Sequence, residues 1–489
     1  MVGLLILFYD CSLKFKGGAM KKVLLIKTAE IFHVNEEPQA VPHGGLGYLA
    51  SSLQAKGFEV ILIDALVEGF DNKENLGNEW FRVGLSRDEL KKRVSEIIPD
   101  FVGISAQFTS QHEMIEEAVE DVRLVTNVPI VVGGIHATFM PEFVLNIRGV
   151  NYVLRGEAEE SLPLLLNATT ENLDKVPGLS FRGGKNINHN PIGCYPDVTR
   201  LPFPARELYP IASSSGDQYS KLNAPHGHKF NEKNLPYYEM ITSRGCNYKC
   251  AGCAGSRFAG SNRTREANEV LGEIEMLVNK FGMRSLAIID DNFIQDKMRA
   301  AAILKEMVRR KYNLNMTFPN GLLIRNLFCD RRKVDKKFID LLRMAGTTEV
   351  DLPIETASPR IMKTYLSNKY DTTLNLGRLC EVLADKGIKV AGYFMLGFPY
   401  ESKEEMESTI ELAQRLKNLG MHNAWVFLVS AFPGSAFWQN GKHFSREELR
   451  NLRFRMASEL NKNISPAELQ KIREEAQQRV DMFSVQFKH

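Results

Sequence analysis

The sequence predicts an α/β protein with a doubly wound, flavodoxin-like sheet, a partial barrel of six β/α units and a helical C-terminal region. Two observations carry this fold class. Uninterrupted apolar runs alternate with amphipathic helical segments along most of the 489 residues. Glycine and polar residues gather where the apolar runs end, as expected at the carboxyl edge of a parallel sheet.

The first series of apolar runs lies between Lys22 and about Leu166. Such uninterrupted strands are typical of a parallel sheet covered by helices on both faces. Glycines at their ends would let a large ligand approach the backbone, although turn chemistry explains each glycine pair equally well. Strands are expected at residues 23–26, 60–63, 101–105, 130–132 and 152–154, and helices at 46–54, 90–97 and 114–125.

The second series begins near Glu239 and makes six β/α units. Active sites of barrels lie at the carboxyl ends of their strands, where this chain carries Asp290, Asp291 and Glu355. A salt bridge or a helix cap would also account for these acidic residues. Strands are expected at residues 241–242, 285–289, 315–319, 350–354, 390–396 and 424–429, and helices at 266–281, 297–310, 334–344, 374–385 and 403–419.

A cysteine triplet, Cys246, Cys250 and Cys253, follows the first strand of this second series. Iron–sulfur clusters are held by thiolates, and three ligands on a four-iron cluster would leave one iron open. An open metal position indicates chemistry rather than structure. The alternative is a zinc site, which needs a fourth Cys or His, and the nearest downstream cysteine, Cys329, is far away.

Composition fits a soluble enzyme: 44% of the residues are hydrophobic and 25% are charged. A net charge of +3 gives no electrostatic case for a nucleic-acid partner. Seven cysteines, three of them clustered, do not form a disulfide framework, so a reducing cytoplasm is expected. The apolar stretch at residues 1–9 is too short to span a bilayer, and no membrane partner is expected. We expect Met20 to be the start and residues 1–19 to be an upstream extension.

The C-x3-C-x2-C spacing and the six β/α units resemble the radical S-adenosylmethionine (SAM) enzymes and their partial (β/α)6 barrel. The resemblance implies that Cys246, Cys250 and Cys253 hold a [4Fe-4S] cluster. It also implies that the backbone at Asp290 and Asp291 meets the SAM methionine amine and that Glu355 binds the SAM ribose. Most members carry an aromatic residue before the third cysteine. Here that residue is Gly252, and Tyr248 or Phe258 could replace the ring.

The first half resembles the cobalamin-binding domain of cobalamin-dependent radical SAM enzymes. Cobalamin contacts are then expected at strand ends. The D-x-H-x-x-G motif that supplies a histidine to cobalt in other corrinoid proteins is missing, so no histidine is expected on the lower face of cobalt. The residues assigned to cobalamin by this resemblance are Ser105, Gln107, Gly133, Gly134, Gly156 and Glu157.

These inferences predict a cobalamin-binding domain at residues 20–166, a connector at 167–237, a radical SAM barrel at 238–440 and a helical region at 441–489. Within the last region, helices are expected at residues 445–461 and 465–482, the second with Pro466 at its first helical position. The expected activity is transfer of a methyl group to an unactivated carbon, or to phosphorus, of a small molecule. A flavodoxin or ferredoxin would supply electrons under anaerobic conditions. Cyclisation or rearrangement without methyl transfer is the alternative, and a non-catalytic iron–sulfur or corrinoid carrier is an alternative of another class. Methylthiolation is disfavoured because residues 20–193 contain no cysteine for a second cluster.

Overall fold

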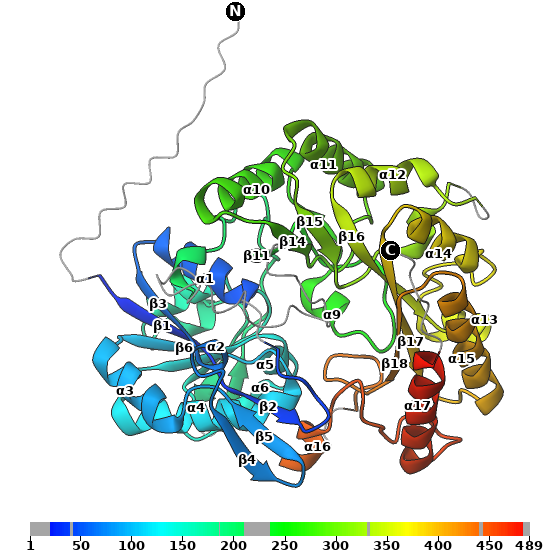
Figure 1. Cartoon of the computed structure of the whole chain (residues 1–489). Coiled ribbons are helices and arrows are strands. Elements are labelled where there is room, and N and C mark those ends of the chain that lie inside the picture. The colour runs from blue at the N-terminus through cyan, green and yellow to red at the C-terminus, as the bar shows by residue number, and fades with distance from the viewer. Residues whose placement is uncertain are drawn as a thin grey trace, which may run out of the picture.

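The computed structural model describes residues 20–39, 43–184, 186–209, 235–329, 333–439 and 444–482. The expected upstream extension at residues 1–19, and most of the polar segment before Leu235, lie outside these ranges. Two large sheets lie side by side, and the helices surround them (Figure 1).

The first sheet has the flavodoxin-like strand order 2-1-3-4-5 among its parallel strands. Its topological switch point, where ligands bind in such sheets, lies between the first and third strands along the chain. In spatial order these strands are β3 (Glu59–Asp64), β1 (Lys22–Lys27), β6 (Phe101–Ser105), β7 (Ile130–Gly133) and β8 (Tyr152–Leu154).

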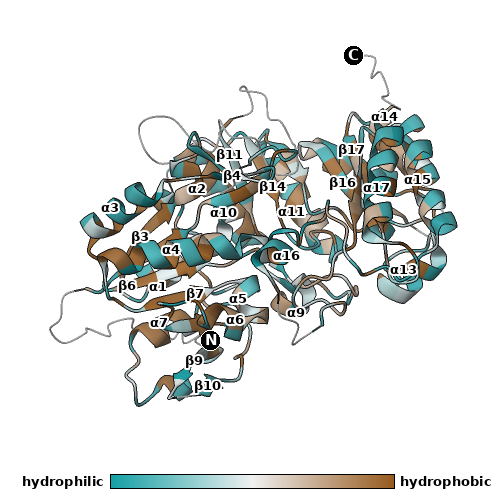
Figure 2. Ribbon diagram, turned by 90° about the horizontal axis from the view of Figure 1, so that it is seen from below, coloured by the Kyte–Doolittle hydropathy of each residue, from teal (hydrophilic) through white to brown (hydrophobic). Residues whose placement is uncertain are grey.

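Alternate residues of these strands enter different cores. Leu25 and Leu62 pack on one face, whereas Ile26 and Ile104 pack on the other. Because both faces are buried, the strands read as continuous apolar runs. Figure 2 shows apolar strands at the centre and largely hydrophilic outer helices. The covering helices are α1 (Gly44–Gln54) and α7 (Ser161–Leu166) on one face, and α3 (Arg87–Ile97), α4 (His112–Val125) and α6 (Pro141–Leu145) on the other.

The first sheet continues beyond residue 166, into the segment that the sequence predicts to be a connector. Two antiparallel strands, β9 (Leu179–Gly183) and β10 (Asn186–His189), extend its edge beyond β8. A separate antiparallel sheet of β2 (Glu30–His33), β5 (Trp80–Val83) and β4 (Lys73–Gly77) was also not predicted. All five strands are short, and they lack the long apolar runs that indicate buried parallel strands.

The second sheet contains six parallel strands and confirms the partial barrel. Each described connection between its strands carries a helix, as parallel crossovers require. The strands in order are β11 (Tyr237–Met240), β14 (Ser285–Ile288), β15 (Asn315–Phe318), β16 (Thr347–Glu355), β17 (Lys389–Leu396) and β18 (Asn423–Leu428).

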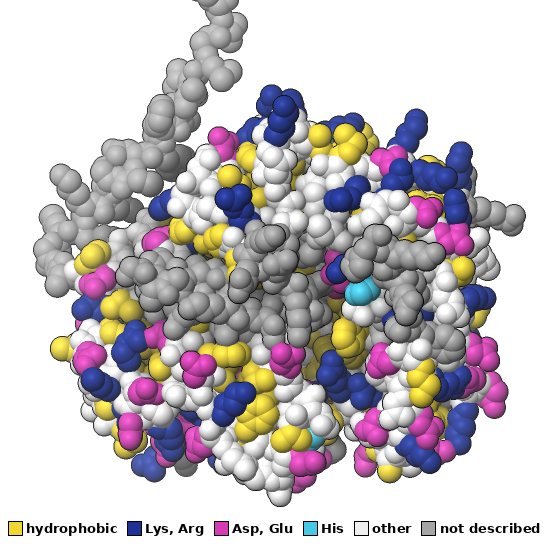
Figure 3. Space-filling view, in the orientation of Figure 1, with side chains coloured by type: hydrophobic (Ala, Val, Ile, Leu, Met, Phe, Trp, Pro, Cys, Tyr) yellow, Lys and Arg dark blue, Asp and Glu magenta, His cyan; other side chains and the backbone are white. Residues whose placement is uncertain are grey.

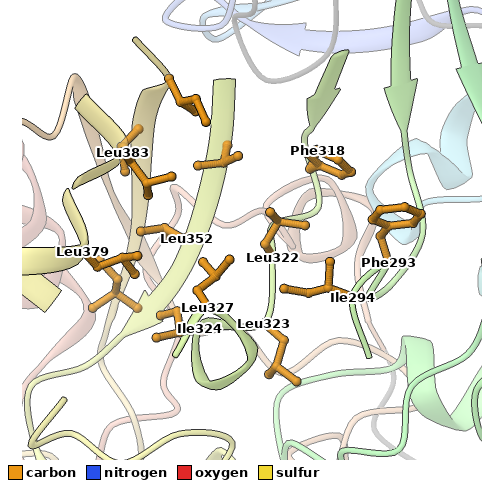
Figure 4. Close-up of a cluster of buried hydrophobic side chains, with 14 of the residues drawn as sticks. Phe293, Ile294, Phe318, Leu322, Leu323, Ile324, Leu327, Leu352, Leu379 and Leu383 are labelled. Carbon is orange, nitrogen blue, oxygen red and sulfur yellow. The ribbon is translucent and has the colours of Figure 1, made fainter. Parts of the chain in front are cut away.

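The core of this second unit lies between the strands and their outer helices. Leu352 of β16 and Leu379 and Leu383 of α14 belong to the same buried cluster (Figure 4). Their burial fixes the strand register, so the alternate residues of β16, including Asp351 and Glu355, face away from this cluster. The outer helices are α10 (Ala267–Phe281), α11 (Lys297–Arg310), α12 (Lys336–Met344), α14 (Leu376–Asp385) and α15 (Lys403–Asn418).

The C-terminal region is less helical than the sequence predicts. The expected helix at residues 445–461 is reduced to α16 (Arg446–Arg450), followed by turns. Its predicted start is correct, since Ser445 caps α16. The second helix, α17 (Pro466–Asp481), begins as predicted with Ser465 as its cap and Pro466 in its first turn.

The surface carries both signs of charge. Basic and acidic side chains are interspersed over the described part of the face seen in Figure 3, in line with the small net charge. Among the described helices, none is both long enough and apolar enough to cross a bilayer.

Candidate functional site

The carboxyl ends of the two sheets meet at an interface built on buried ion pairs. Arg244, just before the cysteine loop, donates to Glu157 at 2.9 Å and lies 2.7 Å from Glu159, both from the end of the first sheet. Its guanidinium also stacks 4.6 Å from the centre of the Tyr48 ring. Arg263 donates to Glu157 as well, at 3.2 Å through Nη1. The strand ends of the two units therefore lie next to each other.

The cysteine loop is held by backbone contacts at several points. The amide of Cys246 donates to the Gly260 carbonyl at 3.1 Å, and that of Ala251 donates to the Tyr365 carbonyl at 2.7 Å. Gly245 has a φ of +83°, and a Cβ there would lie 2.5 Å from the Ser261 carbonyl oxygen. Only glycine fits that position, immediately before the first cysteine.

The three thiols are close enough to influence one another. Burial raises the pKa of Cys250 to about 11, and the neighbouring carboxylate and thiols add to this rise. Burial also raises the pKa of Cys246, with contributions from Asp291 and Cys253. A metal would have to displace protons from both thiols. Cys253 is exposed.

The arrangement fits a cluster better than a single metal ion. Within the described ranges, no three His, Cys, Asp or Glu side chains converge on one ion. A four-iron cluster does not need such convergence, because each thiolate binds a different iron. Three neighbouring thiols on one well-supported loop suit that geometry.

Asp290 and Asp291 support the strand and loop that precede the cluster. The Asp290 carboxylate accepts hydrogen bonds from the Thr242 amide and hydroxyl, both at 2.5 Å, and from the Ser243 hydroxyl at 2.7 Å. Asp291 accepts the Gly245 amide at 2.9 Å. Both carboxylates therefore already accept hydrogen bonds from other groups of the protein. The predicted SAM contact at these residues uses the backbone and stays a prediction.

Glu355 ends β16 in a left-handed backbone conformation, with a φ of +65°. Its carboxylate accepts a hydrogen bond from Lys369 Nζ at 2.5 Å. Lys369 is buried, and the sequence analysis missed it. The predicted contact between Glu355 and the SAM ribose stays a prediction.

The residues assigned to cobalamin separate into two kinds. Ser105 bonds to His43 at 2.7 Å, and Glu157 is committed to the arginines of the interface. Gln107, by contrast, is exposed beside the switch point. Gly134 has a φ of +114°, and a Cβ there would approach the Ala106 carbonyl to 2.6 Å. Gly133 ends β7, and Gly156 lies just after β8. All six cobalamin contacts stay predictions.

The four histidines between Lys22 and Leu166 have protein partners. Thr109, His136 and His112 form a buried chain, with contacts of 3.0 and 2.9 Å. His43 accepts the Leu46 amide at 3.3 Å, and His33 accepts the Asn35 amide at 3.3 Å. The expectation that no histidine binds cobalt from below stays a prediction.

Phe437 is the described aromatic residue nearest to Gly252. A Cβ built at Gly252 would lie 3.4 Å from that ring, which packs edge-on against Tyr365. The sequence analysis proposed Tyr248 or Phe258 for this position. Phe437 is distant in sequence, so local spacing carries no signal for it.

Comparison with known families agrees with this geometry. The B12 binding domain model matches residues 36–166, and the Radical SAM superfamily model matches residues 240–413. The chain is therefore an enzyme of the radical SAM superfamily that carries a B12-binding domain. Within that class, the two matched domains are those of the cobalamin-dependent radical SAM proteins, a group that uses cobalamin, SAM and a [4Fe-4S] cluster.

Individual relatives extend over most of the chain. Cytidylyl-2-hydroxyethylphosphonate methyltransferase of Streptomyces wedmorensis is 26% identical, over 85% of this chain and 80% of that protein. The anaerobic magnesium-protoporphyrin IX monomethyl ester cyclase of Rubrivivax gelatinosus is 24% identical, over 79% of this chain and 65% of that protein. The methyltransferase TsrM of Kitasatospora setae, solved with cobalamin and a [4Fe-4S] cluster, shares the fold with a TM-score of 0.63 at 20% identity. That match covers 85% of this chain and 77% of TsrM.

Proposed function

We propose that this enzyme methylates an unactivated carbon, or a phosphorus, of a small biosynthetic intermediate. The observation that carries the proposal is the meeting of the two sheets at their carboxyl ends. The ion pairs of Arg244 with Glu157 and Glu159 bring the cysteine loop against the strand ends of the B12-binding domain. A substrate in the space between them could contact cofactors from both sides.

Arginines from two separate regions of the chain hold the two domains in this arrangement. Besides Arg244, the C-terminal region contributes Arg450, which lies 2.5 Å from Glu113, and Arg453, which lies 2.8 Å from Glu36. Both guanidiniums also lie over the Trp80 ring, at 5.6 and 5.0 Å. Arg453 donates in addition to the Ile31 carbonyl at 2.8 Å. In the proposed reaction, these contacts would fix the distance between the two cofactor sites.

The residues have distinct roles in this proposal. Cys246, Cys250 and Cys253 would hold the cluster, Glu355 would orient SAM, and Gln107 and Gly134 would face cobalamin. When bound, the cofactors supply radical formation from SAM and delivery of the methyl group. An electron donor such as flavodoxin or ferredoxin, an anaerobic setting and a cytoplasmic location complete the proposal.

The methyltransferases among the relatives support this reading. One is named for a phosphonate substrate, and TsrM has been solved with tryptophan bound. Cyclisation is the second candidate, because the Rubrivivax cyclase is 24% identical over 79% of this chain. A small-molecule substrate is common to both readings.

Methyl-labelled SAM separates the two candidates. We expect labelled product, with 5′-deoxyadenosine and S-adenosylhomocysteine formed in comparable amounts, because one SAM is the oxidant and another the methyl donor. Candidate small molecules can be screened by this product pair. Unlabelled product that forms without a matching amount of S-adenosylhomocysteine would instead indicate cyclisation or rearrangement.

A separate experiment tests the hypothesis that the protein is a non-catalytic iron–sulfur or corrinoid carrier. Anaerobic, reduced enzyme is incubated with SAM alone, and 5′-deoxyadenosine is measured. The Cys250→Ala variant is the matched control, and we expect product only with the unaltered chain. A protein that holds both cofactors but never cleaves SAM would be a carrier.

A further inference from the structure

A short loop after α13 (Pro359–Tyr365) supports the cysteine loop from outside the motif. The Tyr365 carbonyl accepts the Ala251 amide at 2.7 Å, and the Ser367 hydroxyl accepts the Lys249 amide at 3.0 Å. Ser367 and Asn368 are both left-handed, with φ of +54° and +48°. Two consecutive non-glycine residues in that region are unusual. We call residues 365–369 the support loop.

The support loop ends in a buried lysine that faces Glu355. Lys369 is 9% exposed, and its ammonium lies 2.5 Å from the Glu355 carboxylate. The next residue anchors the same strand, because the Tyr370 hydroxyl donates to the Ile354 carbonyl at 2.5 Å. A buried lysine without a partner would be costly. The support loop therefore places the positive charge of Lys369 beside the Glu355 carboxylate.

The support loop places this ammonium near the cysteine loop, because Tyr365 and Ser367 accept the amides of Ala251 and Lys249, the residues on either side of Cys250. Burial lowers the pKa of Lys369, but Glu355 and the Cys250 and Cys253 thiols outweigh it and raise the pKa overall. In return, Lys369 lowers and Glu355 raises the pKa of Cys250. The lysine and the glutamate therefore act on the thiols with opposite sign. A cluster on those thiols would experience both charges.

We propose that Lys369 is a positioning residue that holds the Glu355 carboxylate in place and balances its charge beside the cluster. The inference rests on the cluster and SAM as cofactors and does not depend on methyl transfer. A positive charge near an iron–sulfur cluster stabilises the added electron and raises the reduction potential, and a negative charge lowers it. The salt bridge keeps the two effects nearly cancelled.

The test is an anaerobic redox titration of the reconstituted holoenzyme, followed by electron paramagnetic resonance, without SAM. Lys369→Met should lower the potential of the cluster, and Glu355→Gln should raise it. The double variant should return close to the unaltered protein, because it removes both charges. Lys363→Met is the control, since Lys363 is an exposed lysine on α13, and it should leave the potential unchanged.

SAM affinity provides the second measurement. Lys369→Met should weaken SAM binding on the order of tenfold, since Glu355 would lose the contact that fixes it. Lys369→Arg keeps the charge, so it should restore the potential and part of the affinity. It also keeps the proposal testable if the Met variant fails to hold a cluster.

Two results would overturn the proposal. One is a Lys369→Met potential equal to that of Lys363→Met. The other is a double variant whose shift equals the Lys369→Met shift, which would mean that the Glu355 charge does not balance the lysine at the cluster. Neither outcome depends on whether any substrate is methylated, so failure of the proposed function would remain a separate result.

Discussion

Replacing Glu157 with glutamine tests whether this residue joins the two units or contacts cobalamin. Its side chain is 5% exposed and serves both Arg244 and Arg263. Glutamine keeps the size and removes the charge. Arg244 would retain Glu159 at 2.7 Å. Arg263 would retain the carbonyls of Pro196 and Ala259, at 2.8 and 3.1 Å.

The expected cost follows from these remaining contacts. Breaking a buried ion pair by removing one partner costs about 3–5 kcal/mol. Because both arginines keep some partners, we expect the lower end, about 3 kcal/mol. For a unit of about 200 residues this corresponds to a drop of roughly 6–12 °C in the melting midpoint.

Thermal unfolding of cobalamin-free protein measures this effect. Glu120→Gln is the matched control, because Glu120 pairs with Arg87 at the surface and is 65% exposed. Its loss should cost no more than about 1 kcal/mol. Cobalamin affinity, read by absorbance well below both midpoints, should change little in the Glu157 variant. A normal melting midpoint with impaired cobalamin binding would refute the interface reasoning and make Glu157 a cobalamin ligand.

Three further predictions concern the cofactors and pH. Alanine at any cysteine of the triplet should abolish the cluster and its roughly four irons, measured by absorbance and iron analysis. Alanine at any of three other cysteines should preserve it: Cys194, Cys329 and Cys380. Bound cob(II)alamin should give a paramagnetic resonance spectrum without nitrogen splitting from an axial histidine, and a clear nitrogen triplet would contradict this. Burial raises the pKa of Glu239 from 4.5 to about 7, so the folded state binds its proton more tightly and stability should fall as pH rises from about 4.5 through 7. Glu239→Gln should flatten this fall in urea midpoints, and an unchanged pH profile would exclude the contribution.

The long parallel strands could be predicted because burial on both faces of the sheet requires continuous apolar runs in the sequence. Residues such as Leu25 and Ile26 enter different cores and are both apolar. The short edge strands β9 and β10 have no such apolar run. Five of their nine residues are exposed, so the positions of these strands depend on pairing with β8 and with each other.

The helix expected at residues 445–461 shows where local periodicity fails. The pattern of charges suits an exposed helix, yet the chain leaves the helix after Arg450. Arg453 then bonds to Glu36 and to the Ile31 carbonyl, more than 400 residues earlier. Those contacts, together with stacking on Trp80, outweigh a few further turns of weakly stabilised helix.

The sequence by itself determined the fold class, the cysteine triplet and the missing histidine motif, because each is written in neighbouring residues. Tertiary structure decided which charged groups serve the site. Lys369 has no motif around it and gains its importance from a 2.5 Å contact with Glu355. Arg244 likewise depends on Glu157, 87 positions away. Ion pairs of this kind form between residues that the fold brings together, and a side chain's charge does not specify its partner along the chain.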